Sequence, residues 1–119
     1  RIYVKALKAV KAAGVTVRAC SHITGGGFQE NIPRMLPEGV NAHMDLGSYE
    51  VPAIFKLMQK TGNIADEMMY NTFNMGIGMA IAVKAEDADR AIKAAEEAGE
   101  KAVILGEVIE GEKEVLFNE

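Results

Sequence analysis

The stretch that decides the fold runs from Ser21 to Met35 and reads Ser-His-Ile-Thr-Gly-Gly-Gly-Phe-Gln-Glu-Asn-Ile-Pro-Arg-Met. A β-branched, apolar segment over 15–23 leads into three glycines, and a short amphipathic helix pattern starts at Phe28. Glycine allows positive φ and lets a ligand approach the backbone where no Cβ stands in the way. The glycine turn, residues 24–27, is therefore either a cradle for an anion or a plain tight turn.

The spacing of the glycines matches neither common phosphate-binding fingerprint. The turn lacks the Gly-Lys-Ser/Thr ending of a P-loop and the spaced Gly-x-Gly-x-x-Gly of a dinucleotide site. Spacing alone leaves both interpretations of the turn open.

Length and composition indicate one ordinary globular domain with one core, because 119 residues, 49% of them hydrophobic and 25% charged, can bury most of their apolar surface. A net charge of -4 without a Lys/Arg cluster argues against a nucleic-acid partner. The single cysteine and the lack of a membrane-length apolar run predict a cytoplasmic protein with no membrane partner. The chain starts at Arg1, already inside a helix pattern, so we expect it to be a piece of a longer protein.

The order of periodic segments predicts an α/β (α+β) fold, in which one mixed sheet is covered by helices and a helix crosses over between the last two long strands. Gly111 and Glu112 are expected to form the turn of a hairpin between the last two strands. The predicted helices cover 3–13, 28–36, 51–60, 64–69 and 86–98, and the predicted strands cover 15–23, 39–46, 75–83, 102–109 and 115–117.

Two residues before the turn could carry chemistry. His22 is either a structural, hydrogen-bonded histidine or a general acid/base that contacts substrate. Cys20 is expected to be a small buried hydrophobe rather than a nucleophile. His22 and His43 are far apart in sequence and have no cysteines or carboxylates at ligand spacing, so we expect no metal site.

Further polar residues follow the turn. Asn31 and Arg34, three residues apart, are expected on an exposed face, where they either bind a phosphate or carboxamide or are simply solvated. Asn71, Thr72 and Asn74 bracket Phe73, and this polar segment is either a turn or presents amide side chains to a ligand. Gly76, in the following strand pattern, would allow a ligand or another backbone to approach closely.

Several motifs together resemble one enzyme family. They are His-Ile-Thr-Gly-Gly-Gly (22–27), Glu-Asn-Ile-Pro-Arg (30–34), Asn-Thr-Phe-Asn-Met-Gly-Ile-Gly-Met (71–79), the opening Arg-Ile-Tyr-Val-Lys (1–5) and Gly-Glu-Val (106–108). In this order they resemble the C-terminal domain of the aminoimidazole ribonucleotide (AIR) synthetases, the phosphoribosylformylglycinamidine cyclo-ligases. The resemblance covers essentially the whole chain. Family members often carry tryptophan near Tyr49 and Val51, where this chain has none.

The resemblance implies a fold with a ferredoxin-like core and an enzyme of de novo purine biosynthesis. Such an enzyme uses ATP to activate the formamide oxygen of formylglycinamidine ribonucleotide, an amidine nitrogen closes the imidazole ring, and ADP and phosphate leave. The resemblance also implies a homodimer and an N-terminal domain, absent from this chain, that holds most of the ATP and Mg2+ site. Substrate would lie in a cleft between the two domains.

Carried over by position, the resemblance implies a set of site residues around the glycine turn. His22 is the catalytic candidate beside the turn, and the resemblance implies that the substrate or phosphate site is lined by Thr24, Gly25, Gly26, Gly27, Asn74 and Gly76. Asn31 joins this set because its side chain could hydrogen-bond a phosphate. We expect Gly26→Val to weaken turnover in the full-length protein while leaving the fold largely intact.

Two other readings of the chain stay open. Sister families that use ATP, such as formylglycinamidine ribonucleotide synthetase and selenophosphate synthetase, share the architecture and some glycine motifs. The isolated chain could also serve only as a binding and dimerisation module, because it has neither a lysine-bearing phosphate loop nor an acidic cluster for Mg2+ near the turn. We expect the isolated chain to be inactive.

Overall fold

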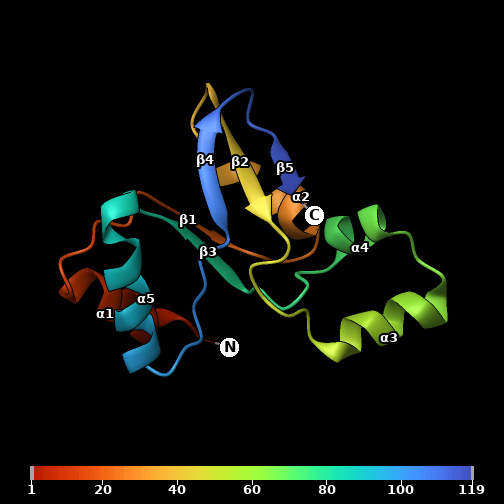
Figure 1. The fold of residues 1–119 in the computed structure, drawn as a ribbon, viewed down its shortest axis with the longest axis horizontal. Coiled ribbons are helices and arrows are strands. Elements are labelled where there is room, and N and C mark those ends of the chain that lie inside the picture. Colours follow the sequence, from red (N-terminus) through yellow and green to blue (C-terminus); the bar gives the residue numbers. More distant parts are fainter. Residues whose placement is uncertain (1, 119) are drawn as a thin grey trace. The chain divides into compact units, whose positions relative to one another are not determined.

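The computed structural model describes residues 2–118, which form two compact units (Figure 1). Within the described residues, unit 1 consists of 2–20 and 81–104, and unit 2 consists of 21–80 and 105–118. Arg1, the first residue of the opening motif, lies outside the described residues. Each unit has its own apolar cluster, so the prediction of a single core is wrong.

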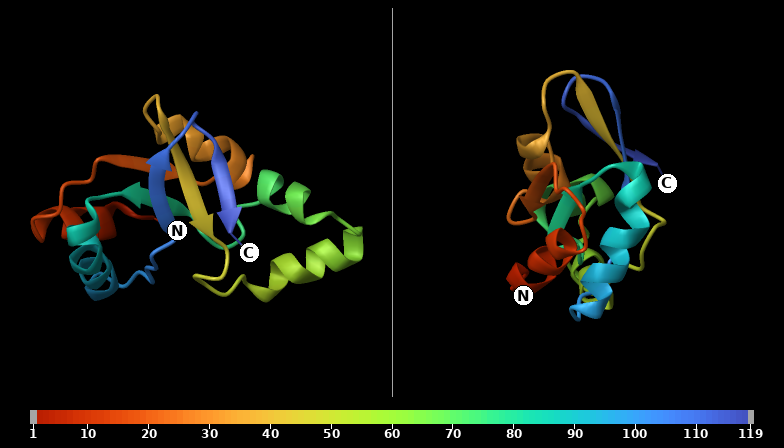
Figure 2. Two further views of the ribbon diagram at one scale, coloured as in Figure 1. Left: turned by 45° about the horizontal axis from the view of Figure 1, so that its top comes forward. Right: turned by 90° about the vertical axis from the view of Figure 1, so that its left-hand side faces the viewer.

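Unit 1 is built around two helices, α1 (Val4–Ala12) and α5 (Ala88–Glu97), which pack side by side (Figures 1 and 2). A 3-10 turn, η2 (Ala85–Asp87), precedes α5. Both predicted helices are confirmed. Small side chains let the helix axes approach closely, and the buried cluster between them consists of Val10, Val15, Ala91 and Ala94.

The sheet of unit 2 has three strands. Its central strand, β2 (Val40–Asp45), pairs with β4 (Gly106–Glu110) in antiparallel fashion and with β5 (Val115–Asn118) in parallel fashion. Figure 2 shows β2 lying between the other two strands. The predicted hairpin is therefore wrong, because β4 and β5 lie on opposite edges of β2 and do not pair with each other.

The remaining strands, β1 (Ala19–His22) and β3 (Met79–Ala82), pair in a separate two-stranded sheet. The prediction of one sheet is wrong, and so is the predicted crossover between β3 and β4, because these two strands belong to different sheets. The α+β class is confirmed, and the ferredoxin-like core stays a prediction. No helix within residues 2–118 has the length and apolar character needed to cross a bilayer.

Unit 2 contains four short helical segments. α2 (Gly27–Asn31) ends one residue before the 3-10 turn η1 (Pro33–Met35), because proline lacks the N–H that would continue an α-helix. The predicted helix over 28–36 is therefore split in two. The other two helices, α3 (Ala53–Gly62) and α4 (Asp66–Thr72), confirm the prediction.

Phe28 anchors α2 in the core of unit 2. Its side chain is fully buried, and its ring stacks on Tyr70 of α4 with 6.1 Å between the centroids. The ring centroid of Phe117, in β5, lies 6.4 Å from that of Phe28. Because the first turn of α2 is fixed by this aromatic cluster, the glycine turn that precedes it is fixed as well. The buried residues of the apolar core of unit 2 are Ile23, Phe28, Ile32, Leu36, Ala42, Met44 and Val115.

Candidate functional site

The glycine turn connects β1 to α2 and is closed by one backbone hydrogen bond, in which the N–H of Gly27 donates to the carbonyl of Thr24 (3.0 Å). Gly26 has φ +100° and Gly27 has φ +60°. Side chains with a Cβ rarely adopt these values, so both positions favour glycine. A Cβ on Gly26 would also lie 2.7 Å from the Cβ of Glu30. We therefore no longer expect Gly26→Val to leave the fold largely intact.

The three glycines have different surroundings. A Cβ on Gly27 would overlap the carbonyl oxygen of Tyr70 and lie 2.6 Å from that of Phe73, so the turn lies directly against the end of α4. A Cβ on Gly25 would meet no heavy atom within 4 Å. Gly25 therefore forms the open side of the turn and Gly27 the packed side.

The carboxamide of Asn31 holds the turn from behind. Its Nδ2 donates to three carbonyl oxygens of the turn, those of Gly27 (2.8 Å), Thr24 (3.2 Å) and Gly25 (3.3 Å). Its Oδ1 accepts hydrogen bonds from Thr24 Oγ1 (3.2 Å) and Arg34 Nη1 (3.3 Å). One amide side chain thus connects the turn to the guanidinium of Arg34.

Asn31 is only 2% exposed, so the prediction that it lies on an exposed face is wrong. The buried Ser21 hydroxyl donates to its backbone carbonyl (2.9 Å) and fixes the end of α2 against β1. Arg34 is exposed, as predicted. The sequence pattern placed both residues correctly on one helical turn but could not reveal that the asparagine faces inward.

The second predicted group, Asn74 and Gly76, lies beside the first. The N–H of Ile23 donates to the carbonyl of Gly78 (2.9 Å), which places the segment after β1 next to the segment before β3. Asn74 Oδ1 accepts the N–H of Gly76 (2.9 Å) and closes a tight turn. Gly76 has φ +100°, and a Cβ there would overlap the ring of Pro52. Its glycine is therefore required by the backbone.

His22 ends β1 and is exposed, one residue before the buried Ile23. Cys20 is exposed as well, so the prediction of a small buried hydrophobe is wrong. Its exposure follows from the alternation of the strand, in which Ser21 is the buried residue. In the described part of the chain, no three His, Cys, Asp or Glu side chains gather where they could hold a metal ion.

Unit 2 also contains a cleft of about 790 Å³ that the sequence analysis did not identify. Tyr70 and Phe117 line it, and their ring centroids are 5.4 Å apart. Polar side chains at its rim include Gln29 and Asn71. The helical pattern of α4 indicated apolar contacts but gave no sign that Tyr70 joins an aromatic pair with β5.

Tyr49 lies close to this cleft and donates its hydroxyl to the carbonyl of Met75 (3.1 Å). Met75 is a buried residue with φ +54°, which is unusual for a side chain with a Cβ. Burial raises the pKa of the Tyr49 hydroxyl above its usual value, and the neighbouring Tyr70 raises it further. Burial also raises the pKa of Tyr70, with a second contribution from Asp66.

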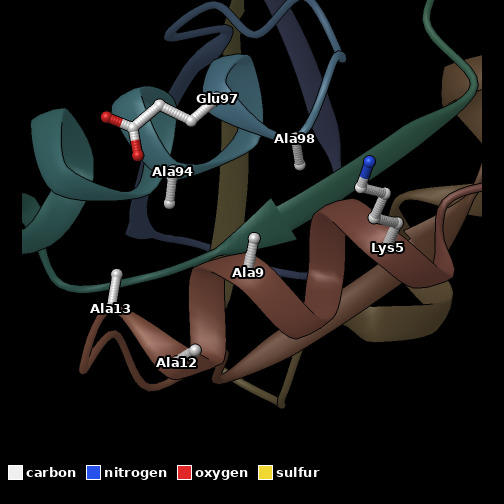
Figure 3. Close-up of a pocket in the computed structure, with 7 residues that line it drawn as sticks. All are labelled: Lys5, Ala9, Ala12, Ala13, Ala94, Glu97 and Ala98. Atoms are coloured by element: carbon white, nitrogen blue, oxygen red, sulfur yellow. The ribbon is translucent and has the colours of Figure 1, made fainter.

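Unit 1 has a groove of about 440 Å³ between α1 and α5 (Figure 3). Figure 3 shows that its walls are mainly alanine side chains, with Lys5 and Glu97 as the charged members. Alanines at a helix contact are explained by close packing. This groove therefore does not compete with the glycine turn as a candidate site.

These features define an α+β domain in which Asn31 fixes the glycine turn and a second tight turn lies beside it. Residues 1–118 match the family model described as "AIR synthase related protein, C-terminal domain", and the chain belongs to this family. The resemblance seen in the sequence motifs is confirmed.

Three curated relatives carry the name phosphoribosylformylglycinamidine cyclo-ligase. The chain is 59% identical over 115 residues to the relative from Agathobacter rectalis, which covers 97% of this chain and 34% of that protein. It is 58% identical over 117 residues to the relative from Lachnoclostridium phytofermentans, and 47% identical over 117 residues to that from Caldanaerobacter subterraneus subsp. tengcongensis; each match covers 98% of this chain and 34% of the relative. The chain therefore spans about a third of the length of these relatives.

Proposed function

We propose that this chain is the C-terminal domain of a phosphoribosylformylglycinamidine cyclo-ligase. The enzyme would convert formylglycinamidine ribonucleotide to aminoimidazole ribonucleotide in de novo purine biosynthesis, with release of ADP and phosphate. The observation that carries this proposal is the identity of 59% to a relative of that name, over 97% of the chain. The names of the other relatives support it over the sister families.

In this proposal the glycine turn binds the phosphate group of the ribonucleotide. Gly25 supplies the open side of the turn, where an anion can reach the backbone without meeting a Cβ. Asn74 and Gly76 border the same site, since Ile23 pairs with Gly78 in the neighbouring segment. His22, exposed at the end of β1, is the candidate general acid or base.

The proposal also includes the partners that the family resemblance implies. ATP and Mg2+ would be held mainly by an N-terminal domain, as the resemblance implies. The full-length protein would be a cytoplasmic homodimer. The isolated chain would bind but not turn over substrate.

Mixing this chain with the separately produced N-terminal part of the protein tests the proposal. The assay measures ADP release that depends on formylglycinamidine ribonucleotide. We expect ADP only from the mixture and from the intact protein. ADP release by the 119-residue chain alone would contradict the assignment of ATP to the other domain.

A second arm separates the cyclo-ligase from its sister families. The intact protein is assayed with formylglycinamidine ribonucleotide and then with formylglycinamide ribonucleotide plus glutamine, or with selenide, as alternative substrates. Turnover of the first substrate alone supports the proposal. Turnover of another substrate, with none of the first, would overturn it.

A further inference from the structure

The bonding capacity of the Asn31 side chain is fully used inside the protein. A carboxamide oxygen has two lone pairs and its nitrogen two hydrogens. The oxygen accepts from Thr24 Oγ1 and Arg34 Nη1, and the nitrogen lies within hydrogen-bond distance of three carbonyl oxygens. Since the residue is also 2% exposed, Asn31 has no free group with which to contact a ligand.

The hydrogen bonds donated by Asn31 Nδ2 also orient the carbonyl groups of the turn. Three carbonyl oxygens, those of Thr24, Gly25 and Gly27, are drawn toward the buried amide. Carbonyl oxygens repel an anion, and their inward orientation keeps these three oxygens away from an anion on the outer side of the turn. The Glu30 carboxylate borders the turn at Gly26. The open space at Gly25 lies on this turn.

Arg34 adds a positive charge at the same place. Its Nη1 and Thr24 Oγ1 donate to one and the same oxygen of Asn31, so the guanidinium lies next to the turn. The guanidinium is exposed and uses one of its five N–H donors in this bond. The remaining donors can reach a phosphate in the forked geometry that arginine favours.

We propose that Asn31 is a positioning residue, which fixes the glycine turn and holds Arg34 beside it so that the turn and the guanidinium bind one phosphate group together. This inference rests on the proposed function for the identity of the substrate. It assigns Arg34 as a phosphate ligand and moves Asn31 from the binding set to its support.

The test uses the full-length protein that carries this domain, with inorganic phosphate as the probe. Hydrogen–deuterium exchange of the peptide covering 21–35 is measured with increasing phosphate. Three variants are compared with wild type. Asn31→Asp keeps an accepting oxygen, loses the Nδ2 donors and adds a negative charge. Arg34→Gln removes the guanidinium with its charge, and Asn63→Asp makes the same change as Asn31→Asp at an exposed residue after α3.

We expect phosphate to slow exchange in wild type and in Asn63→Asp. In Arg34→Gln, exchange without phosphate should match wild type, and the apparent Kd for phosphate should rise about tenfold or more, since charge-assisted bonds are lost. In Asn31→Asp, exchange should be faster before phosphate is added, and protection should be lost. If Asn31→Asp does not fold, Arg34→Gln still decides whether the guanidinium binds the phosphate.

Steady-state kinetics provides a readout that a purely structural role would not change. A ground-state phosphate contact affects KM far more than kcat. We therefore expect Arg34→Gln to raise KM for the ribonucleotide about tenfold or more, with kcat within about threefold of wild type and KM for ATP unchanged.

The outcomes separate this inference from the proposed function. Equal phosphate protection in all variants, or none in wild type, would overturn the inference whether or not the protein is a cyclo-ligase. The expected exchange pattern in a protein without cyclo-ligase activity would overturn the proposed function and leave the phosphate site standing.

Discussion

Gly27 and Tyr70 meet backbone to backbone, so closely that a Cβ on the glycine would overlap the tyrosine carbonyl oxygen. This contact joins the glycine turn to the end of α4. Replacement of Gly27 therefore disturbs two elements together, whereas Gly25, two residues earlier, borders open space.

Gly27→Ala should destabilise the protein strongly. The methyl group would have to displace backbone atoms, and the residue would keep φ +60°, so we expect a loss of about 3 kcal/mol in the free energy of unfolding. Urea unfolding followed by circular dichroism measures this loss. Gly25→Ala is the matched control, and an equal loss in both variants would contradict the packing that the structure describes.

Gly25→Ala should instead affect binding. Because its methyl group would occupy open space on the outer side of the turn, we expect stability within about 1 kcal/mol of wild type. In the full-length protein, KM for the ribonucleotide should rise several-fold with kcat little changed. Wild-type kinetics in Gly25→Ala would indicate that phosphate does not approach the turn from this side.

Asn41→Ala should loosen the connection between β4 and β5. The buried Asn41 Oδ1 accepts the N–H groups of Glu112 (2.6 Å) and Glu114 (2.9 Å). Loss of this acceptor leaves two donors without their partner and should cost about 2–3 kcal/mol. Asn41→Asp keeps the accepting oxygen and should lose less stability in the same urea experiment. The opposite ranking of the two variants would contradict the role of the oxygen.

Stability at high pH should depend on Tyr49. Burial raises the pKa of its hydroxyl in the folded state, while the unfolded chain titrates near 10.0. Above that pH the unfolded state binds fewer protons than the folded state, so the free energy of unfolding falls as pH rises. Below it, the stabilisation from the neutral hydroxyl is fully present.

Tyr49→Phe tests this dependence. At pH 9 the variant should be about 1 kcal/mol less stable than wild type, because the bond to the Met75 carbonyl is lost. At pH 11 the difference should shrink, since phenylalanine does not titrate. Parallel stability curves for the two proteins between pH 9 and 11 would contradict the raised pKa.

Local patterns predicted most elements because each is set by residues close in sequence. The helical periodicity of α1, α3, α4 and α5 was sufficient to predict these helices, and the alternation of polar and apolar residues was sufficient to predict β2. The prediction of a hairpin between β4 and β5 is wrong because of a contact between residues far apart in sequence. Gly111 and Glu112 have turn chemistry, but Asn41 binds the backbone on both sides of Lys113 and directs the chain across the start of β2. A contact between residues 71 positions apart overrode the local preference.

The candidate site likewise contains features that the local sequence predicts and features that depend on contacts between distant residues. The glycine turn was predictable because the positive φ at Gly26 and Gly27 favours glycine. The inward orientation of Asn31 was not predictable, because the three-residue spacing from Asn31 to Arg34 fits a buried and an exposed face equally well. The cleft lined by Tyr70 and Phe117 brings together α4 and the last strand, and no local signal connects them.

The strand order β4-β2-β5 makes completion of unit 2 wait until β4 and β5 have been synthesised. Asn41 leaves the ribosome 71 residues before its partner Glu112. At about 5–20 residues per second, β2 spends about 4–14 s of translation with both edges unpaired. A strand with unpaired edges is a template for pairing with other nascent chains. Early chaperone contact should therefore centre on residues 40–45, and a ribosome stalled before residue 106 should carry a chain that still aggregates.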